Sequence, residues 1–132
     1  MDRKMTDEEI NSLTERIIAA AIRVRKELGL GFLEKVYENA MFIQLREDGL
    51  EAAQQQPLVV KYHNQIVGEY IADLVIARTV IVELKAARAI EPIFIAQTLN
   101  YLKATQLSVA LLFNFGPQKL EFKRLVGPSF QK

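Results

Sequence analysis

The sequence predicts a single domain of the α/β (α+β) class, in which helices flank a mixed central sheet in the order α-α-β-β-β-α-β-β. In the first third of the chain, apolar residues recur every three or four positions, as on one face of a helix. After Pro57, runs rich in β-forming residues alternate with short turns, and one helical stretch interrupts them. The 132 residues fit one core, without repeats or a long linker, so we predict one domain over 1–132 with a core of about 7–126.

Two helices are predicted at the beginning of the chain. Thr6 with Glu9 three residues later forms a capping box, and Gly29 marks the end of the first helix. The second helix begins near Leu33 and ends at Gly49. The buried face of the first helix comprises Ile10, Leu13, Ile17, Ala20 or Ala21, Val24 and Leu28.

The rest of the chain reads as strands with one more helix. Pro at the first helical position, after Glu91, begins that helix. The strands around the turn at Ala77–Thr79 are apolar almost throughout, which is typical of the centre of a sheet. The predicted segments are the strand Leu58–Tyr62, the strand Ile66–Ile76 with a bulge near Gly68, the strand Val80–Ala86, the helix Pro92–Ala104 and the strands Leu107–Phe113 and Lys119–Leu125.

Charged residues inside this apolar hairpin are the main candidates for a functional site. Asp73 stands alone in one strand, and Glu83 and Lys85 share a face of the next strand because they are two residues apart. A three-residue loop would place Asp73 opposite Glu83. Buried charges are costly unless they are paired or bind a cation. The hairpin therefore predicts either a site or a structural salt bridge between Glu83 and Lys85, with or without Asp73.

Composition restricts the chemistry of such a site. There is no cysteine and one histidine, His63, so a metal would need oxygen ligands, which favours Mg²⁺ or Mn²⁺ over zinc. A net charge of +1 speaks against an extensive nonspecific nucleic-acid interface. No apolar run has the length of a membrane span, and Met1–Glu9 lacks the features of a signal peptide, so we expect a cytoplasmic protein without membrane contact.

Several motifs together resemble a known family. Asp73 followed by Glu83-Leu84-Lys85 on a hairpin resembles the PD-(D/E)XK nuclease-like superfamily, and Gly31-x-x-Glu34-x-x-Tyr37 resembles the signature of its GxxExxY proteins. The similarity spans roughly residues 10–126, although Ala72 replaces the usual proline before the aspartate. Further matching segments are Gly29-Leu30-Gly31, Ala96-Gln97, Tyr101-Leu102-Lys103 and Asn114-Phe115-Gly116.

The resemblance implies a restriction-endonuclease-like fold and a metal centre. Asp73 and Glu83 would bind Mg²⁺ or Mn²⁺ together with the backbone carbonyl of Leu84. Glu34 would be a further ligand or hold a metal-bound water. Lys85 would orient the attacking water and offset charge on the scissile phosphate.

The third predicted helix adds a further catalytic candidate. Gln97 would point at the site from that helix, or else be an amide at the edge of the core. Tyr101 shares its helix face, and it and Tyr37 are expected to be packing residues with a secondary role in the site. The implied function is metal-dependent hydrolysis of nucleic acid, and the alternative is a non-catalytic module that binds nucleic acid or a protein partner. The sequence does not give the oligomeric state.

Overall fold

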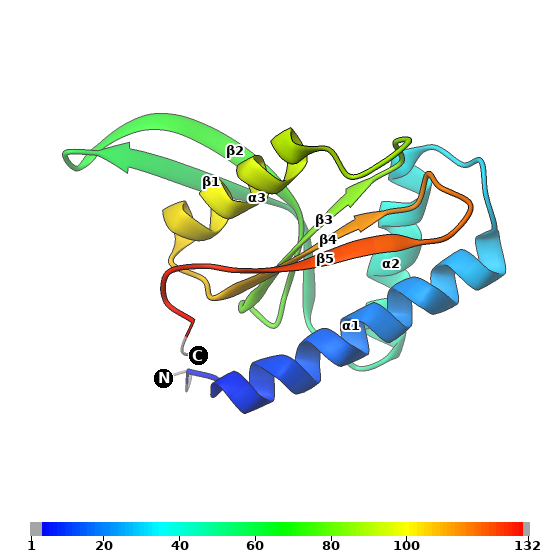
Figure 1. The fold of residues 1–132 in the computed structure, drawn as a ribbon. Coiled ribbons are helices and arrows are strands. Elements are labelled where there is room, and N and C mark those ends of the chain that lie inside the picture. The colour runs from blue at the N-terminus through cyan, green and yellow to red at the C-terminus, as the bar shows by residue number, and fades with distance from the viewer. Residues whose placement is uncertain (1–3, 131–132) are drawn as a thin grey trace.

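The computed structural model describes residues 4–130, which form three helices and one five-stranded mixed sheet (Figure 1). The α/β class and the predicted element order are confirmed. The termini of the predicted domain, 1–3 and 131–132, lie outside the described residues. The elements are α1 Asp7–Leu28, α2 Glu34–Glu47, β1 Ala52–Tyr62, β2 Gln65–Ile76, β3 Val80–Lys85, α3 Pro92–Thr105, β4 Val109–Asn114 and β5 Glu121–Val126.

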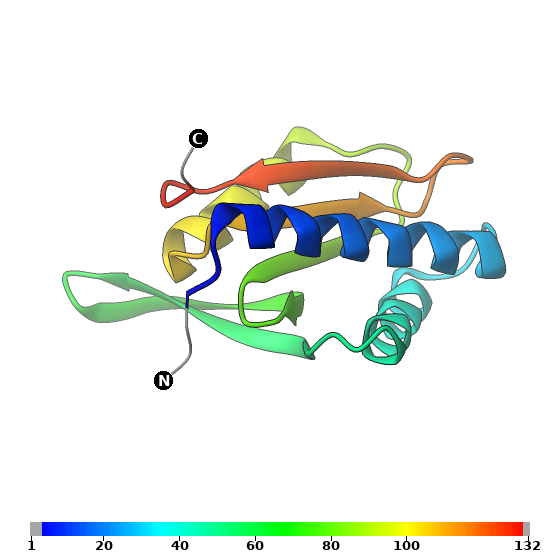
Figure 2. The same ribbon diagram turned by 90° about the horizontal axis from the view of Figure 1, so that it is seen from below.

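The sheet has the order β1-β2-β3-β4-β5 and separates two hydrophobic clusters. α1 and α2 cover one face and α3 covers the other (Figures 1 and 2). Only β3 and β4 pair in parallel, and α3 makes the crossover between them. Every residue of β3 except Lys85 is buried, as predicted for the sheet centre. This position encloses Glu83, the one acid of β3, in the middle of the molecule.

The ends of the first two helices follow local chemistry. The capping box of Thr6 and Glu9 is present at the start of α1. Gly29 follows the last residue of α1 with a φ of 75°, a left-handed value that glycine adopts without strain. The side chain of Arg25 donates hydrogen bonds to the carbonyl oxygens of Phe115, Pro117 and Gln118. The end of α1 is thereby attached to the turn between β4 and β5.

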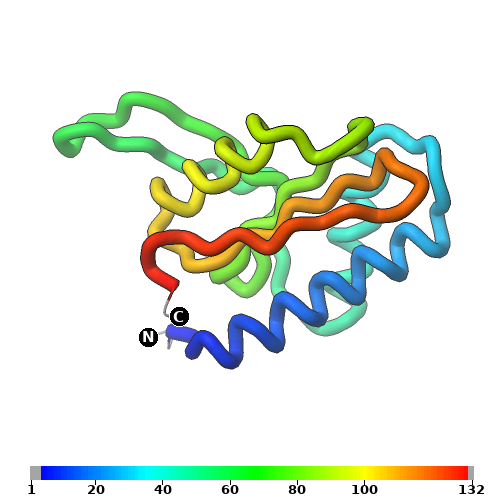
Figure 3. Tube along the Cα trace, viewed as in Figure 1, coloured from blue at the N-terminus to red at the C-terminus, as the bar shows by residue number. Residues whose placement is uncertain are grey.

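The first strand is longer than predicted. It begins at Ala52 instead of Leu58 and contains Pro57, which we had placed before the strand. β1 is an edge strand with a single neighbour, β2, and an edge strand tolerates a residue without an N–H. The β1–β2 hairpin turns at His63 and Asn64, which have φ values of 49° and 64°, and it extends beyond the rest of the sheet (Figure 3).

The predicted register of the central hairpin is confirmed. Ile76 pairs with Val80 around the three-residue loop, and the ladder continues to Leu74 opposite Val82. Farther out, β1 and β2 have the expected irregularity near Gly68, because Val60 pairs with Gly68 whereas the next residue pairs with Ile66.

β2 changes its orientation at Asp73. Ala72 belongs to the cluster beneath α3, whereas Leu74, two residues later, belongs to the cluster beneath α1 and α2. A regular strand would keep both residues on one face. Opposite Asp73, the paired residues skip Gln55, which has a left-handed φ of 55°. The twist at this point also separates β2 from β3, whose ladder ends just before Asp73.

The described helices include none with the length and apolar character required to cross a membrane. The N-terminal stretch in which we found no signal peptide lies partly outside the described residues.

Candidate active site

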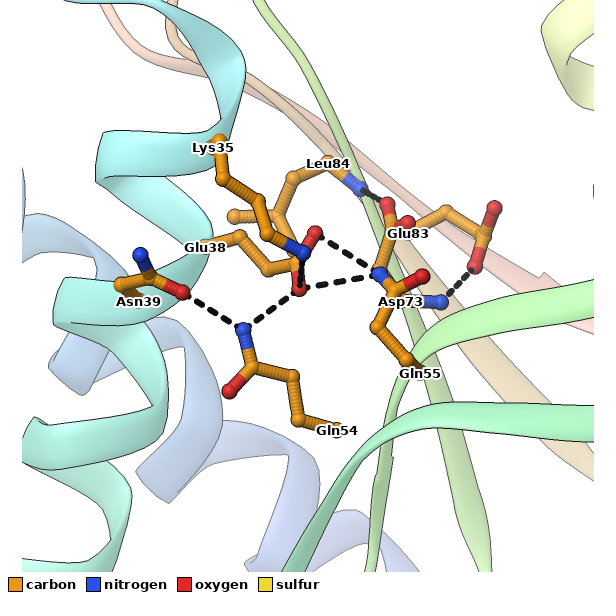
Figure 4. Close-up of polar contacts among 8 residues, drawn as sticks. All are labelled: Lys35, Glu38, Asn39, Gln54, Gln55, Asp73, Glu83 and Leu84. Carbon is orange, nitrogen blue, oxygen red and sulfur yellow. Dashed lines mark hydrogen bonds and ion pairs between the residues drawn. The ribbon is translucent and has the colours of Figure 1, made fainter.

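Asp73 and Glu83 lie where β2 separates from β3, and each carboxylate contacts the backbone of the opposite strand (Figure 4). The backbone N–H of Asp73 donates to Glu83 Oε2 at 2.7 Å. The backbone N–H of Leu84 donates to Asp73 Oδ2 at 2.8 Å. The two side chains therefore replace the ladder hydrogen bonds that would otherwise continue here, and they hold the two acids close together.

This arrangement makes both acids unusually weak. Burial is the largest cause that raises the pKa of Asp73 to about 6, and the charges of Glu38 and Glu34 add to it. Burial also raises the pKa of Glu83 to about 8, and repulsion by Asp73 is the next cause. Lys85 and the backbone hydrogen bonds act in the opposite direction on both groups. A cation placed at these carboxylates would relieve both the burial cost and the repulsion.

The donor set suits a hard divalent cation. Within residues 4–130, Asp73 Oδ1 and Glu83 Oε1 accept no hydrogen bond. Every fully buried side-chain oxygen in that range has a hydrogen-bond partner, so these two oxygens must be accessible to solvent. The N–H of Leu84 points toward β2, and the carbonyl of a strand residue lies on the same side as its N–H. The two carboxylates are therefore accessible oxygen donors, a type of ligand that Mg²⁺ accepts when water fills its other positions.

A closed cage of side chains is not formed. Within the described part of the chain, no three His, Cys, Asp or Glu side chains gather closely enough to hold a metal ion. Glu34 is exposed at the first position of α2. Its charge raises the pKa of both Asp73 and Glu83, but its side chain is not grouped with theirs. The two carboxylates therefore form an open arrangement and not a closed set of ligands.

Lys85 forms no ion pair with Asp73 or Glu83 in residues 4–130, so the salt-bridge alternative is not what the structure adopts. Its Nζ atom instead lies 4.8 Å from the centroid of the Phe94 ring at the start of α3. The charge still lowers the pKa of both acids. The ammonium group thus lies against an aromatic ring while its charge acts on both carboxylates.

On the α2 side, a second acid was missed by sequence reasoning. Glu38 is buried and accepts hydrogen bonds from Lys35, Gln54 and Gln55 at 2.6 to 3.1 Å (Figure 4). It affects Asp73 more strongly than Glu34 does. Its position one helical turn after Glu34 was a usable signal, because residues four apart share a helix face. Glu38 attaches β1 to α2 at the strand twist.

On the α3 side, Tyr101 and Gln97 lie beside a small pocket. Tyr101 is buried, and burial followed by the charges of Glu83 and Asp73 raises its pKa to about 12, so its hydroxyl stays protonated at neutral pH. Its ring is tilted against Tyr70 of β2, with 5.6 Å between centroids. Gln97 is half-buried and lines the same pocket. Sequence reasoning overlooked Tyr70, whose β-strand position carries no distinctive signal.

Tyr37 lies in the core. Its ring stacks on Phe115, with 4.6 Å between centroids, and its hydroxyl donates to the carbonyl of Gly29 at 2.6 Å. The same hydroxyl accepts the N–H of Phe32 at 3.3 Å. These contacts hold the link between α1 and α2 and so fix where Glu34 begins its helix.

Comparison with known proteins identifies a family for nearly the whole chain. The model of the PD-(D/E)XK nuclease superfamily matches residues 11–125, a range that contains all the candidate site residues. A search of curated proteins found no match. Among three matching solved chains, the crystal structure of SSO0001 aligns with a TM-score of 0.57 at 14% sequence identity, over 71% of this chain and 50% of that one. This chain thus matches half the length of that structure, and the likeness is one of fold.

Proposed function

The chain belongs to the PD-(D/E)XK nuclease superfamily, and on that premise we propose that it is a divalent-metal-dependent nuclease that hydrolyses phosphodiester bonds of nucleic acid. The proposal places it among the GxxExxY proteins, as one domain over 1–132. The observation that carries the proposal is the pair Asp73 and Glu83, held together by backbone N–H groups at a cost that a bound cation would offset without protonation.

In this proposal, Asp73, Glu83 and the carbonyl of Leu84 hold Mg²⁺ or Mn²⁺, with Glu34 acting through a bound water. The bound cation would supply a Lewis acid and lower the pKa of a coordinated water. The backbone N–H groups of Asp73 and Leu84 fix the direction of the two carboxylates, which keeps their other oxygens available.

The remaining candidates surround this pair. Lys85, placed against Phe94, would orient the attacking water and stabilise negative charge on the scissile phosphate. Gln97, on the α3 side, would position the substrate through its amide. Tyr101 keeps its proton at neutral pH and would donate a hydrogen bond near the carboxylates. Tyr37 would act indirectly, by fixing the start of α2.

A non-catalytic module that binds nucleic acid or a protein is the second candidate. It is favoured by the lack, within residues 4–130, of three side chains gathered to hold a metal. It is disfavoured by the burial of Glu83, because a binding surface does not need a weak acid in the centre of the sheet.

A nuclease assay separates the two candidates. Labelled single- and double-stranded DNA and RNA would be incubated with the protein in Mg²⁺, in Mn²⁺ or in chelator, beside the variants Glu83→Gln and Asp73→Asn. Glu69→Gln, which changes an exposed carboxylate of β2 away from the pair, is the matched control. We expect cleavage that requires metal and is reduced at least a hundredfold in both site variants but less than twofold in the control, following the usual scale of such losses.

Cleavage that persists equally in Glu83→Gln would identify a contaminating enzyme and contradict the proposal. Metal-independent binding of nucleic acid without cleavage would favour the non-catalytic candidate. Calorimetric titration with Mg²⁺ and Mn²⁺ gives a second readout, since both site variants should lose binding.

A further inference from the structure

A small pocket lies between α3 and the projecting β1–β2 hairpin. Its volume is about 200 Å³. Ile93, Ala96, Gln97 and Asn100 of α3 line one side, at positions that share a helix face. Tyr70 closes the opposite side with 46% of its surface exposed, and Tyr101 contributes its ring next to Tyr70.

The lining excludes some ligands and favours others. None of the lining residues is charged, so the pocket does not suit a phosphate or a carboxylate. Its volume is below the roughly 300–1,000 Å³ of pockets for drug-sized molecules, which leaves room for one flat ring system. The exposed ring of Tyr70 and the two amides, Gln97 and Asn100, offer a stacking surface with hydrogen-bond donors and acceptors at its edge. Stacking together with amide contacts is how proteins recognise an unpaired base.

The pocket adjoins the acidic pair. Tyr101 is common to both, because its ring lines the pocket while the charges of Glu83 and Asp73 act on its hydroxyl. Gln97 lies one helical turn before it, and Lys85 is held against Phe94 at the beginning of the same helix. A nucleotide whose base occupied the pocket would therefore place a neighbouring phosphate close to the carboxylates.

We propose that the pocket formed by Tyr70, Gln97 and Asn100 binds a single unpaired nucleobase next to the scissile phosphate, which makes single-stranded nucleic acid the preferred substrate class. The inference rests on the proposed nuclease function and specifies its substrate. A paired base within a duplex cannot enter, because its edge is occupied by its partner and its faces by its neighbours.

Binding of a fluorescein-labelled single-stranded oligonucleotide, measured by anisotropy in chelator, tests the pocket without cleavage. We expect Tyr70→Ala to weaken binding about tenfold, in line with roughly 1–3 kcal/mol per stacked base, and Asn100→Ala to weaken it less. Tyr62→Ala is the matched control, because Tyr62 is 65% exposed at the end of the hairpin and does not line the pocket. Its affinity should change less than twofold.

Direct occupancy is measured by titrating free nucleosides. The chain has four tyrosines and no tryptophan, so quenching of its fluorescence by a stacked base reports on tyrosine alone. Nucleosides should quench the wild type, whereas ribose 5-phosphate should not. Because Tyr70→Phe keeps the stacking ring but loses that fluorophore, its affinity for nucleosides is measured by displacement of the labelled oligonucleotide and should match that of the wild type.

The outcomes distinguish the pocket from the nuclease. Nucleoside binding that depends on Tyr70, in a protein that cleaves nothing, supports the pocket while the nuclease proposal fails. Metal-dependent cleavage with equal affinity of wild type, Tyr70→Ala and Tyr62→Ala overturns the pocket while the nuclease stands. Equal affinity for a blunt duplex and a single strand also overturns it.

Discussion

Neutralising Glu83 should make the protein more stable at neutral pH. The folded state raises the pKa of this carboxyl from 4.5 to about 8, so folding favours its protonated form. The contribution of this carboxyl to the stability of the folded state is therefore complete below its unfolded pKa of 4.5 and is lost as the pH rises through its folded pKa of about 8. Near pH 7 the lost stability of the folded state is about 3 kcal/mol on the relation of about 1.4 kcal/mol per pKa unit. We expect about 2 kcal/mol, because part of the shift comes from repulsion by Asp73, which is half-buried and screened by water.

Glu83→Gln removes this loss and retains an oxygen for the N–H of Asp73. Urea unfolding in chelator, followed by circular dichroism, should show the variant more stable than wild type by about 2 kcal/mol near pH 7 and by less than about 1 kcal/mol near pH 5. Glu69→Gln should differ from wild type by less than about 0.5 kcal/mol at either pH. A variant that is less stable than wild type near neutrality would refute the reasoning.

Divalent metal should make the wild type more stable than Glu83→Gln, the reverse of their order in chelator. A ligand that binds only the folded state stabilises it by about 2.7 kcal/mol at a hundredfold excess over its Kd. Mg²⁺ or Mn²⁺ should therefore raise the Tm of the wild type and leave Glu83→Gln nearly unchanged. A wild type whose Tm does not respond to either metal would contradict the metal centre.

Three further substitutions test the surroundings of the site by urea unfolding. Glu38→Leu should cost about 2 kcal/mol, because two glutamine amides and a lysine lose their buried acceptor, whereas Glu38→Gln should cost less than half of that; equal losses would contradict this. Gly116→Ala should cost about 1–3 kcal/mol, because its Cβ would lie 2.0 Å from the carbonyl oxygen of Ala87, whereas Gly68→Ala, with 3.8 Å to its nearest neighbour, should be nearly neutral. Tyr37→Phe should cost about 1–2 kcal/mol and leave the metal response of the Tm unchanged, and a lost response would give the hydroxyl a direct role.

The central hairpin could be predicted from sequence because its constraints are local. Apolar runs on both sides of three turn residues fix the register, and the ten-residue spacing of Asp73 and Glu83 then brings the acids together. The pocket could not be predicted in this way. Alternation along β2 would place Tyr70 on the same face as Leu74, but the twist at Asp73 turns them to opposite sides of the sheet. At that twist Gln55 donates a hydrogen bond to Glu38 of α2, a tertiary contact that no local pattern reveals.

The two halves of β1 also differ in how far local sequence predicts them. The apolar run after Pro57 predicted a strand, but the polar segment from Ala52 to Gln56 did not. Those residues are extended because β2 supplies an edge to pair with and α2 supplies Glu38 as an acceptor. Tertiary contacts, absent from a local reading, decide where this strand begins.

The closeness of Asp73 and Glu83 along the chain also has a consequence for the order of folding events. The hairpin that joins them closes over a three-residue loop, whereas β3 meets β4 only after the α3 crossover is complete. Local hairpins form faster than pairings that need a long loop to close. The repulsion between the acids therefore arises early, before Phe94 of α3 can hold Lys85 beside them. The repulsive part of the cost, which is the second cause after burial, should accordingly appear in the refolding rate more than in the unfolding rate, and refolding of the wild type should slow as the pH rises from about 5 to about 8. In such a protein, a divalent cation would shorten the time spent unfolded as well as stabilise the final fold.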